Sequence, residues 1–206
     1  MPLVKDLVCR APKTGNKGED RSITMLYIMR HGSTDWNEMN RLQGQTDIPL
    51  NEKGRKMAES AREEYRSVHF DICYSSPLLR SKETADIITE GRGIPVLTDD
   101  RLKEMAFGVC EGIMDYRTDP DCPVAKLFHD PQNYKDPPEG AESLDDLFTR
   151  TGSFLKEVID PELDKGKDIL IVGHGVMNMS IICLKRMIPR SRFWDAGLDQ
   201  CRLMGL

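Results

Sequence analysis

Two of the four histidines occupy the same place relative to two short apolar runs. His31 comes after the run at 24–29 and the single residue Arg30. His174 comes after the run at 169–173, and a glycine directly follows each histidine. A short apolar run that stops at polar residues and glycine is typical of a buried strand. In an open parallel α/β sheet, ligands bind beyond the carboxyl ends of the strands. We therefore expect both histidines at one ligand-binding edge of a sheet.

A third basic group joins this edge. Ser76 can cap, and Pro77 can begin, a helix that runs to about Thr89, which places Arg80 in the first turn. The free N–H groups and the dipole of a helix N-terminus favour an anion. Arginine presents a planar fork of donors that matches phosphate oxygens. Together with Arg30, these residues predict a cationic pocket for a phosphate group.

A metal site and a purely structural role are the two other interpretations of the histidines. A zinc site needs three or four ligands, often at close spacing, and arginines beside the ligands would repel the ion. The pattern therefore disfavours a metal. Each histidine could instead pack at a strand end without any chemistry, but the repeated His-Gly ending disfavours this for the pair.

The elements that must position these side chains alternate along the chain. In order we expect a strand at 24–29, a loop at 33–49, a helix after Asn51, a strand at 70–74, the helix with Arg80, a strand at 95–98, a helix at 143–158, a strand at 169–172 and a helix at 176–187. Such alternation produces a mainly parallel sheet between two helical layers. The sequence therefore predicts an α/β three-layer sandwich, with no internal repeat and no second domain.

One long segment interrupts the alternation. Residues 113–140 contain prolines, glycines and aromatic residues without a sustained period. Long loops in compact domains usually serve as lids or specificity elements, so we expect this insertion to contact substrate. It carries six acidic and three basic residues.

Size and charge limit the classes of function. The 206 residues fit one ordinary domain, and the formal net charge of −5 argues against nucleic acid or an anionic membrane as partner.

No apolar run is long enough to cross a bilayer and the first ten residues lack a signal-peptide core, so we expect a cytoplasmic protein. The six cysteines lack metal-ligand spacing, which indicates reduced thiols. Residues 10–22 are polar and aperiodic, and we expect a flexible extension over residues 1–22.

Seven short motifs follow one another along the chain. They are R-H-G-S-T-D-W-N at 30–37, L-Q-G at 42–44, P-L-N-E-K-G at 49–54, S-S-P-L-L-R at 75–80, E-M-A-F-G-V-C-E-G at 104–112, G-A-E-S at 140–143 and V-G-H-G at 172–175. In type and order they resemble the histidine phosphatase superfamily in its phosphoglycerate mutase-like branch. The R-H-G motif alone is weak evidence for the family, whereas the seven motifs in this order are specific for it. The resemblance implies a phosphoglycerate mutase-like fold and a catalytic domain over residues 23–206.

The resemblance also implies a role for each matching residue. His31 would be the nucleophile that forms a phosphohistidine. Arg30, Arg80 and His174 would hold the three phosphoryl oxygens, and Glu104 would act as general acid and then as base. Ser33, Asn37, Gln43, Gly44 and Gly175 resemble the positions that contact phosphate and substrate. The implied activity is hydrolysis of a phosphomonoester on a small phosphorylated metabolite without metal or cofactor, and a homodimer is left open.

Three features depart from the family pattern. Ser33 stands where Glu or Gln is more usual, and this shorter donor leaves room for a larger substrate or for water. Ala141 stands where the P-G-G-E-S-like motif has a glycine, so the backbone has less freedom there. The chain stops at Leu206, and the completeness of the last edge strand is therefore left open.

The resemblance leaves two alternatives to a phosphatase. A cofactor-dependent phosphoglycerate mutase returns the phosphoryl group to a bound intermediate and needs extra positive charge, whereas residues 113–140 are acidic. The mutase branch tends to carry Leu-Gln-Gly where this chain has Cys110, Glu111 and Gly112, a form that resembles the family's broad phosphatases. A non-catalytic phospholigand-binding module is the second alternative, although all the catalytic residues are present. We therefore expect a phosphatase.

Overall fold

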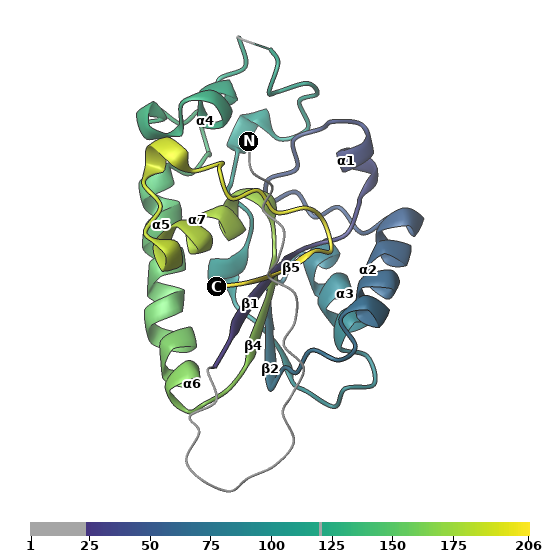
Figure 1. The fold of residues 1–206 in the computed structure, drawn as a ribbon. Helices are drawn as coiled ribbons and strands as arrows, with labels where there is room; N and C mark the ends of the chain where they lie inside the picture. The colour runs from purple at the N-terminus through teal and green to yellow at the C-terminus, as the bar shows by residue number, and fades with distance from the viewer. Residues whose placement is uncertain (1–23, 120) are drawn as a thin grey trace, which may run out of the picture.

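The computed structural model describes residues 24–119 and 121–206. These residues form a sheet in the order β3-β2-β4-β1-β5, with helices on both faces (Figure 1). The strands are β1 (Leu26–Arg30), β2 (Ile72–Ser75), β3 (Val96–Thr98), β4 (Ile169–Gly173) and β5 (Leu203–Gly205). Strands β1 to β4 run parallel, and β5 is antiparallel to β1. The predicted three-layer α/β sandwich with a mainly parallel sheet is confirmed.

The register of β1 and β4 brings two strand ends together. Arg30, at the end of β1, lies beside Gly173, at the end of β4. The next residues are His31 and His174, and the backbone N–H of His31 donates to the carbonyl of Gly173 at 2.9 Å. Both histidines therefore lie at one edge of the sheet, as the two apolar runs predict.

Helices cover the sheet on two sides (Figure 1). They are α1 (Asp35–Glu38), α2 (Glu52–Glu64), α3 (Leu79–Thr89), α4 (Ala125–His129), α5 (Leu144–Phe154), α6 (Asp160–Asp164) and α7 (Gly175–Arg186). Successive side chains of a strand point to opposite faces. Ile28 accordingly packs in the core beneath α5 and α7, and its neighbour Met29 packs in the core beneath α2 and α3. Both side chains are fully buried, which stabilises the fold by about 1.5–3 kcal/mol each.

Local capping explains where two of the helices begin. The Asn51 side chain accepts from the N–H of Gly54 at 2.8 Å, so α2 begins where the sequence predicts. Ser143 forms a capping box with Asp146 at the start of α5. The helix predicted over 143–158 differs at its other end, because α5 stops at Phe154 and a π turn at Leu155–Ile159 joins it to α6.

The start of α3 differs from the prediction. The helix begins at Leu79, two residues later than Pro77, and Ser76 is not its cap. Leu78, the N-cap residue, has no side chain that can accept a hydrogen bond. The carboxylate of Asp47, 32 positions earlier, accepts from the N–H of Leu79 at 2.7 Å instead. Arg80 remains in the first turn, as predicted.

Residues 113–119 and 121–140 are folded against the body of the protein. They contain α4 and a 3₁₀ turn at Pro131–Asn133. Val124, Leu127 and Tyr134 are at most 4% exposed and belong to the main core. The insertion therefore forms a packed wall, whose outer side chains are free to face a ligand.

The edge strand that the sequence left open is present. Strand β5 pairs with β1, with Tyr27 opposite Gly205 and Met29 opposite Leu203. Cys73, Cys110, Cys122, Cys183 and Cys201 are free and buried, in agreement with reduced thiols. The extension predicted over 1–22 lies outside the described residues. In the part of the chain that the structure describes, no helix has the length and apolar character required to cross a membrane.

Candidate active site

A cavity of about 240 Å³ lies at the carboxyl edge of the sheet. Eight of the ten predicted site residues line it, namely Arg30, His31, Asn37, Gln43, Gly44, Arg80, Glu104 and Gly175. His174 is fully buried and packs edge-on against the ring of His31, with ring centroids 5.1 Å apart. Ser33 is buried but is not part of the lining, and its carbonyl accepts from the N–H of Asn51 at 3.1 Å. The fold thus gathers nine of the ten residues in one place.

The ring of His31 is held in one tautomer. Its Nδ1 atom lies 2.7 Å from the carbonyl oxygen of Gly32. A carbonyl can only accept, so Nδ1 carries the proton and Nε2 carries the lone pair. Burial, together with the charges of Arg80 and Arg30, lowers the pKa of His31 well below its ordinary 6.5. His31 is therefore neutral at pH 7, with the lone pair on Nε2.

Two arginines flank the ring of His31. Arg80 is 1% exposed, and its Nη2 and Nη1 atoms donate to the carbonyls of Gly44 at 2.7 Å and Thr46 at 2.9 Å. Burial lowers the pKa of Arg80 to about 10, which leaves the guanidinium charged at neutral pH. Arg30 lies beside Glu104, whose charge opposes the lowering of the Arg30 pKa by burial.

Several buried nitrogens at this edge have no hydrogen-bond partner among the described residues. They include Nε of Arg30, Nε of Arg80 and both ring nitrogens of His174, and Nε of Arg41, which also lines the cavity, likewise has no hydrogen-bond partner among these residues. Burial and the charge of Arg80 lower the pKa of His174, so its ring is neutral with one donor. Buried polar atoms without partners are rare because each costs free energy. The oxygens of a phosphoryl group are the acceptors that these donors fit.

Glu104 lies at the N-terminus of α7. Its Oε1 atom accepts from the N–H of its own neighbour and from that of Met177, both at 2.9 Å, and Oε2 accepts from the N–H of Val176 at 3.2 Å. The N–H groups of a first helical turn have no partner within the helix, so they fix the carboxylate. A Cβ on Gly175 would lie 3.7 Å from both Glu104 Oε2 and Arg30 Nε. The carboxylate and the guanidinium thus border the same small space.

The amides of Asn37 and Gln43 are oriented by a shared donor. The hydroxyl of Thr34 lies 3.0 Å from the side-chain oxygen of each. Gln200, from the C-terminal segment, also donates to the Asn37 oxygen at 2.9 Å. Because their oxygens are engaged, the amide nitrogens of Asn37 and Gln43 are the atoms that can donate to a ligand.

The outer wall of the cavity comes from residues that the sequence did not single out. They include Arg41, Tyr116, Arg117, Phe128, Trp194 and Asp199. The guanidinium of Arg117 lies 5.5 Å from the Tyr116 ring and 5.1 Å from the Phe128 ring, and Phe128 stacks on Trp194 at 5.4 Å. Only the expectation that residues 113–140 contact substrate pointed to this wall, and it named no side chain.

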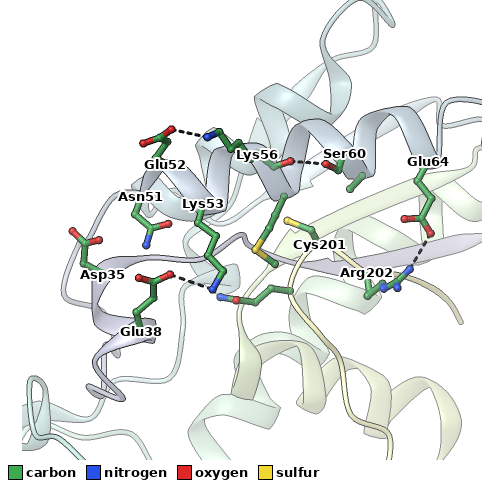
Figure 2. A pocket seen from close by; sticks show the side chains of 13 residues that line it. Asp35, Glu38, Asn51, Glu52, Lys53, Lys56, Ser60, Glu64, Cys201 and Arg202 are labelled. Carbon is green, nitrogen blue, oxygen red and sulfur yellow. Dashed lines mark hydrogen bonds and ion pairs between the residues drawn. The ribbon is translucent and has the colours of Figure 1, made fainter.

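A larger hollow of about 720 Å³ lies beside α1 and α2 (Figure 2). Its charged side chains pair with one another, as in Lys53 with Glu38 at 3.2 Å and Arg202 with Glu64 at 2.9 Å (Figure 2). None of the ten predicted site residues lines this hollow. The candidate chemistry is therefore confined to the smaller cavity.

Comparison with known proteins settles the family. The model of the histidine phosphatase superfamily (branch 1) matches residues 26–206. The chain belongs to the histidine phosphatase superfamily. One similar histidine phosphatase is phosphoserine phosphatase 1 of Hydrogenobacter thermophilus, 30% identical over 179 residues, which cover 84% of this chain and 82% of that protein.

Other relatives of this histidine phosphatase differ in their named activity. The 2,3-bisphosphoglycerate-dependent phosphoglycerate mutase of Cytophaga hutchinsonii is 34% identical over 153 residues, which cover 73% of this chain and 72% of that protein. A mycobacterial glucosyl-3-phosphoglycerate phosphatase, solved in complex with VO3, has a TM-score of 0.78 at 29% identity, with 89% of this chain and 92% of that chain covered. Both phosphatases and mutases thus resemble this chain.

Proposed function

We propose that this histidine phosphatase hydrolyses the phosphomonoester of a small phosphorylated metabolite through a phosphohistidine at His31. The contact of His31 Nδ1 with the Gly32 carbonyl at 2.7 Å carries the proposal. It leaves the lone pair on Nε2, beside the guanidinium groups of Arg30 and Arg80. A neutral nucleophile next to fixed positive charge is what phosphoryl transfer requires.

The first half of the reaction transfers the phosphoryl group to the enzyme. Nε2 of His31 forms a bond to phosphorus while the ester P–O bond breaks. Glu104 Oε2, which has a single N–H partner, gives its proton to the leaving oxygen. A general acid of this kind typically contributes about 10²- to 10⁴-fold, or roughly 3–5 kcal/mol of barrier.

The second half regenerates the enzyme. The Glu104 carboxylate takes a proton from water, the water oxygen attacks phosphorus, and the N–P bond to His31 breaks to release inorganic phosphate. Arg30, Arg80 and His174 donate to the phosphoryl oxygens in both halves, through nitrogens that are already buried and oriented. Because these donors are fixed before substrate binds, they stabilise the transition state at little cost in reorganisation.

We propose that no metal takes part and that the enzyme acts in the cytoplasm. Among residues 24–119 and 121–206, no group of three or more His, Cys, Asp or Glu side chains could hold a metal ion. The positive charge that a metal often supplies to phosphoryl transfer is present in Arg30 and Arg80.

The alcohol part of the substrate would lie against the outer wall. Arg41 and Arg117 add two positive charges there, opposed by Asp199. Tyr116 and Phe128 hold the Arg117 guanidinium against their faces. This wall favours a metabolite that carries a second anionic group on its alcohol part, and residues 113–140 act as the specificity element.

A phosphoglycerate mutase is the second candidate. The mutase relative and the extra charge of Arg41 and Arg117 favour it. A mutase would hand the phosphoryl group of His31 to a second hydroxyl of the bound molecule, with water excluded. The Glu111-Gly112 form of the sequence favours the phosphatase, and we rank hydrolysis first.

An assay with chelator present separates these functions. Purified protein is supplied with p-nitrophenyl phosphate, a panel of phosphometabolites, and 3-phosphoglycerate together with 2,3-bisphosphoglycerate. Release of inorganic phosphate that His31→Ala abolishes supports the phosphatase. Interconversion of phosphoglycerates with little phosphate released would indicate the mutase, and binding without turnover would indicate a phospholigand-binding module.

A further inference from the structure

Glu111 lies near the cavity but does not line it. Its carboxylate accepts four hydrogen bonds. Oε1 accepts from the N–H of Gln45 at 2.9 Å and of Phe107 at 3.1 Å, and Oε2 accepts from the N–H of Thr46 at 2.8 Å and from the Thr46 hydroxyl. Glu111 and Thr46 are 65 positions apart, so this carboxylate joins two distant segments of the chain.

The loop that Glu111 holds in turn holds Arg80. The carbonyls of Gly44 and Thr46 accept from Nη2 and Nη1 of Arg80 at 2.7 and 2.9 Å. Two acceptors, one for Nη1 and one for Nη2, limit the rotation of the guanidinium, and Nε is left without a partner among the described residues. The path runs from the Glu111 carboxylate through the backbone of residues 44–46 to the group that we assign to a phosphoryl oxygen.

The fit between Glu111 and this loop is close. Gly44 has φ of +54°, a conformation that favours glycine, and a Cβ there would lie 2.1 Å from Glu111 Oε1. The Glu111 charge also opposes the lowering of the Arg80 pKa by burial. The carboxylate therefore holds the loop that positions Arg80, and it also favours the charged form of the guanidinium.

We propose that Glu111 is a positioning residue for phosphoryl transfer, because it fixes residues 44–46 and through them the guanidinium of Arg80. The inference rests on the proposed function of the cavity. It adds a specific reason for the Glu in the Cys110-Glu111-Gly112 motif. A group misplaced by about 1 Å can cost 10²-fold in rate, so loss of this clamp affects turnover although Glu111 never touches substrate.

The decisive variant is Glu111→Gln. The glutamine side chain has one oxygen and one NH₂ group, and the NH₂ group cannot accept a hydrogen bond. The variant therefore loses either the hydrogen bonds from Thr46 or those from Gln45 and Phe107. We expect kcat/KM to fall about 10- to 100-fold, mainly through kcat. Thr46→Val removes only the hydroxyl donor and should cost about 2- to 5-fold. Glu157→Gln is the matched control, because that carboxylate is largely exposed and pairs with Arg101 outside the cavity.

A double-mutant cycle with Arg80→Lys shows whether Glu111 acts through Arg80. Lysine has no fork to span the two carbonyls, so the clamp has nothing to orient in that background. We expect Glu111→Gln to change kcat/KM less than about threefold there. An equal factor in both backgrounds, or wild-type activity in Glu111→Gln, would overturn the inference. If Glu111→Gln does not fold by circular dichroism, the same cycle is made with Thr46→Val: disappearance of its loss on the Arg80→Lys background supports the inference, and an equal factor in both backgrounds overturns it.

Orthovanadate binding separates this inference from the proposed function. If the wild-type protein releases no phosphate from any ester, the proposed function fails before any variant is made. The affinity for orthovanadate, measured by calorimetry, then tests the role of Glu111 alone. Weaker orthovanadate binding in Glu111→Gln than in wild type supports this role, provided that Glu111→Gln does not weaken binding further on the Arg80→Lys background. Equal orthovanadate affinity in wild type and Glu111→Gln would contradict it.

Discussion

His31 Nδ1 lies 2.7 Å from the carbonyl oxygen of its own neighbour Gly32. The acceptor thus comes from the backbone, where no substitution can remove it, and it leaves Nε2 as the unprotonated nitrogen. In this histidine phosphatase, the arginines beside the ring lower the His31 pKa and also bind the phosphoryl oxygens in the proposed reaction. The same charges keep the nucleophile neutral and stabilise the transferred group.

The first prediction concerns the protonation of His31. Its pKa lies well below 6.5 because of burial and the charges of Arg80 and Arg30, so the ring stays neutral at pH 6. Nitrogen chemical shifts of ¹⁵N-histidine-labelled protein, followed from pH 8 to pH 5.5, should show His31 with the proton on Nδ1 throughout. Titration of His31 near pH 6.5, or a proton on Nε2, would contradict the assigned tautomer.

The second prediction concerns stability against pH. His31 and His174 have lowered pKa values in the folded protein, whereas both protonate near pH 6.5 in the unfolded chain. The unfolded state therefore binds up to two more protons below pH 6.5, and the free energy of unfolding falls as pH decreases. The limiting slope is about 2.7 kcal/mol per pH unit. Urea unfolding at a series of pH values from 7.5 to 5.5 measures how the free energy of unfolding depends on pH. His31→Gln should roughly halve the slope of that dependence. A free energy of unfolding that does not change over this pH range would contradict the lowered pKa values.

The third prediction concerns Glu104. If it protonates the leaving oxygen, Glu104→Gln should lower kcat about 10²- to 10⁴-fold for alkyl phosphates. p-Nitrophenolate leaves without a proton, so p-nitrophenyl phosphate should lose much less in its first step. Single-turnover rates on the two kinds of ester measure the difference. The same loss for both esters would show that Glu104 is not the general acid.

The fourth prediction concerns the outer wall. Arg117→Ala should raise KM about 10- to 100-fold for metabolites with a second anionic group, since a charge-assisted contact is worth about 1.5–3 kcal/mol. p-Nitrophenyl phosphate lacks that group and should be nearly unaffected. Arg190→Ala is the control, because Arg190 also lies over an aromatic ring, that of Phe148, but outside the cavity. An equal rise in KM for both substrates would argue against a second anion site.

Local sequence patterns were sufficient for the parts of the site that lie next to a strand or helix end. His31 and His174 follow apolar runs directly, so the pairing of β1 and β4 alone brings them together. Asn51 and Ser143 cap the helices that follow them, because a cap needs only the next three residues.

Long-range contacts account for what the sequence did not show. The cap of α3 comes from Asp47 on a separate loop, while Ser76 and Pro77, which have the local cap chemistry, stay outside the helix. Arg117 reaches the cavity only because residues 113–140 fold back against Trp194 and its neighbours. Ser33 follows the R-H-G motif directly, yet it is buried and does not line the cavity. Each of these three placements depends on tertiary packing, which the spacing of apolar residues along the chain does not reveal.

The most direct test of the account is to trap the phosphoryl-enzyme. Wild-type protein is mixed with p-nitrophenyl phosphate, quenched in alkali within the first turnover to preserve phosphohistidine, digested and examined by mass spectrometry. We predict one added phosphoryl group on the peptide that contains His31, and none in His31→Ala. Phosphate release by wild-type protein without that modification, or undiminished turnover by His31→Ala, would contradict the phosphohistidine mechanism.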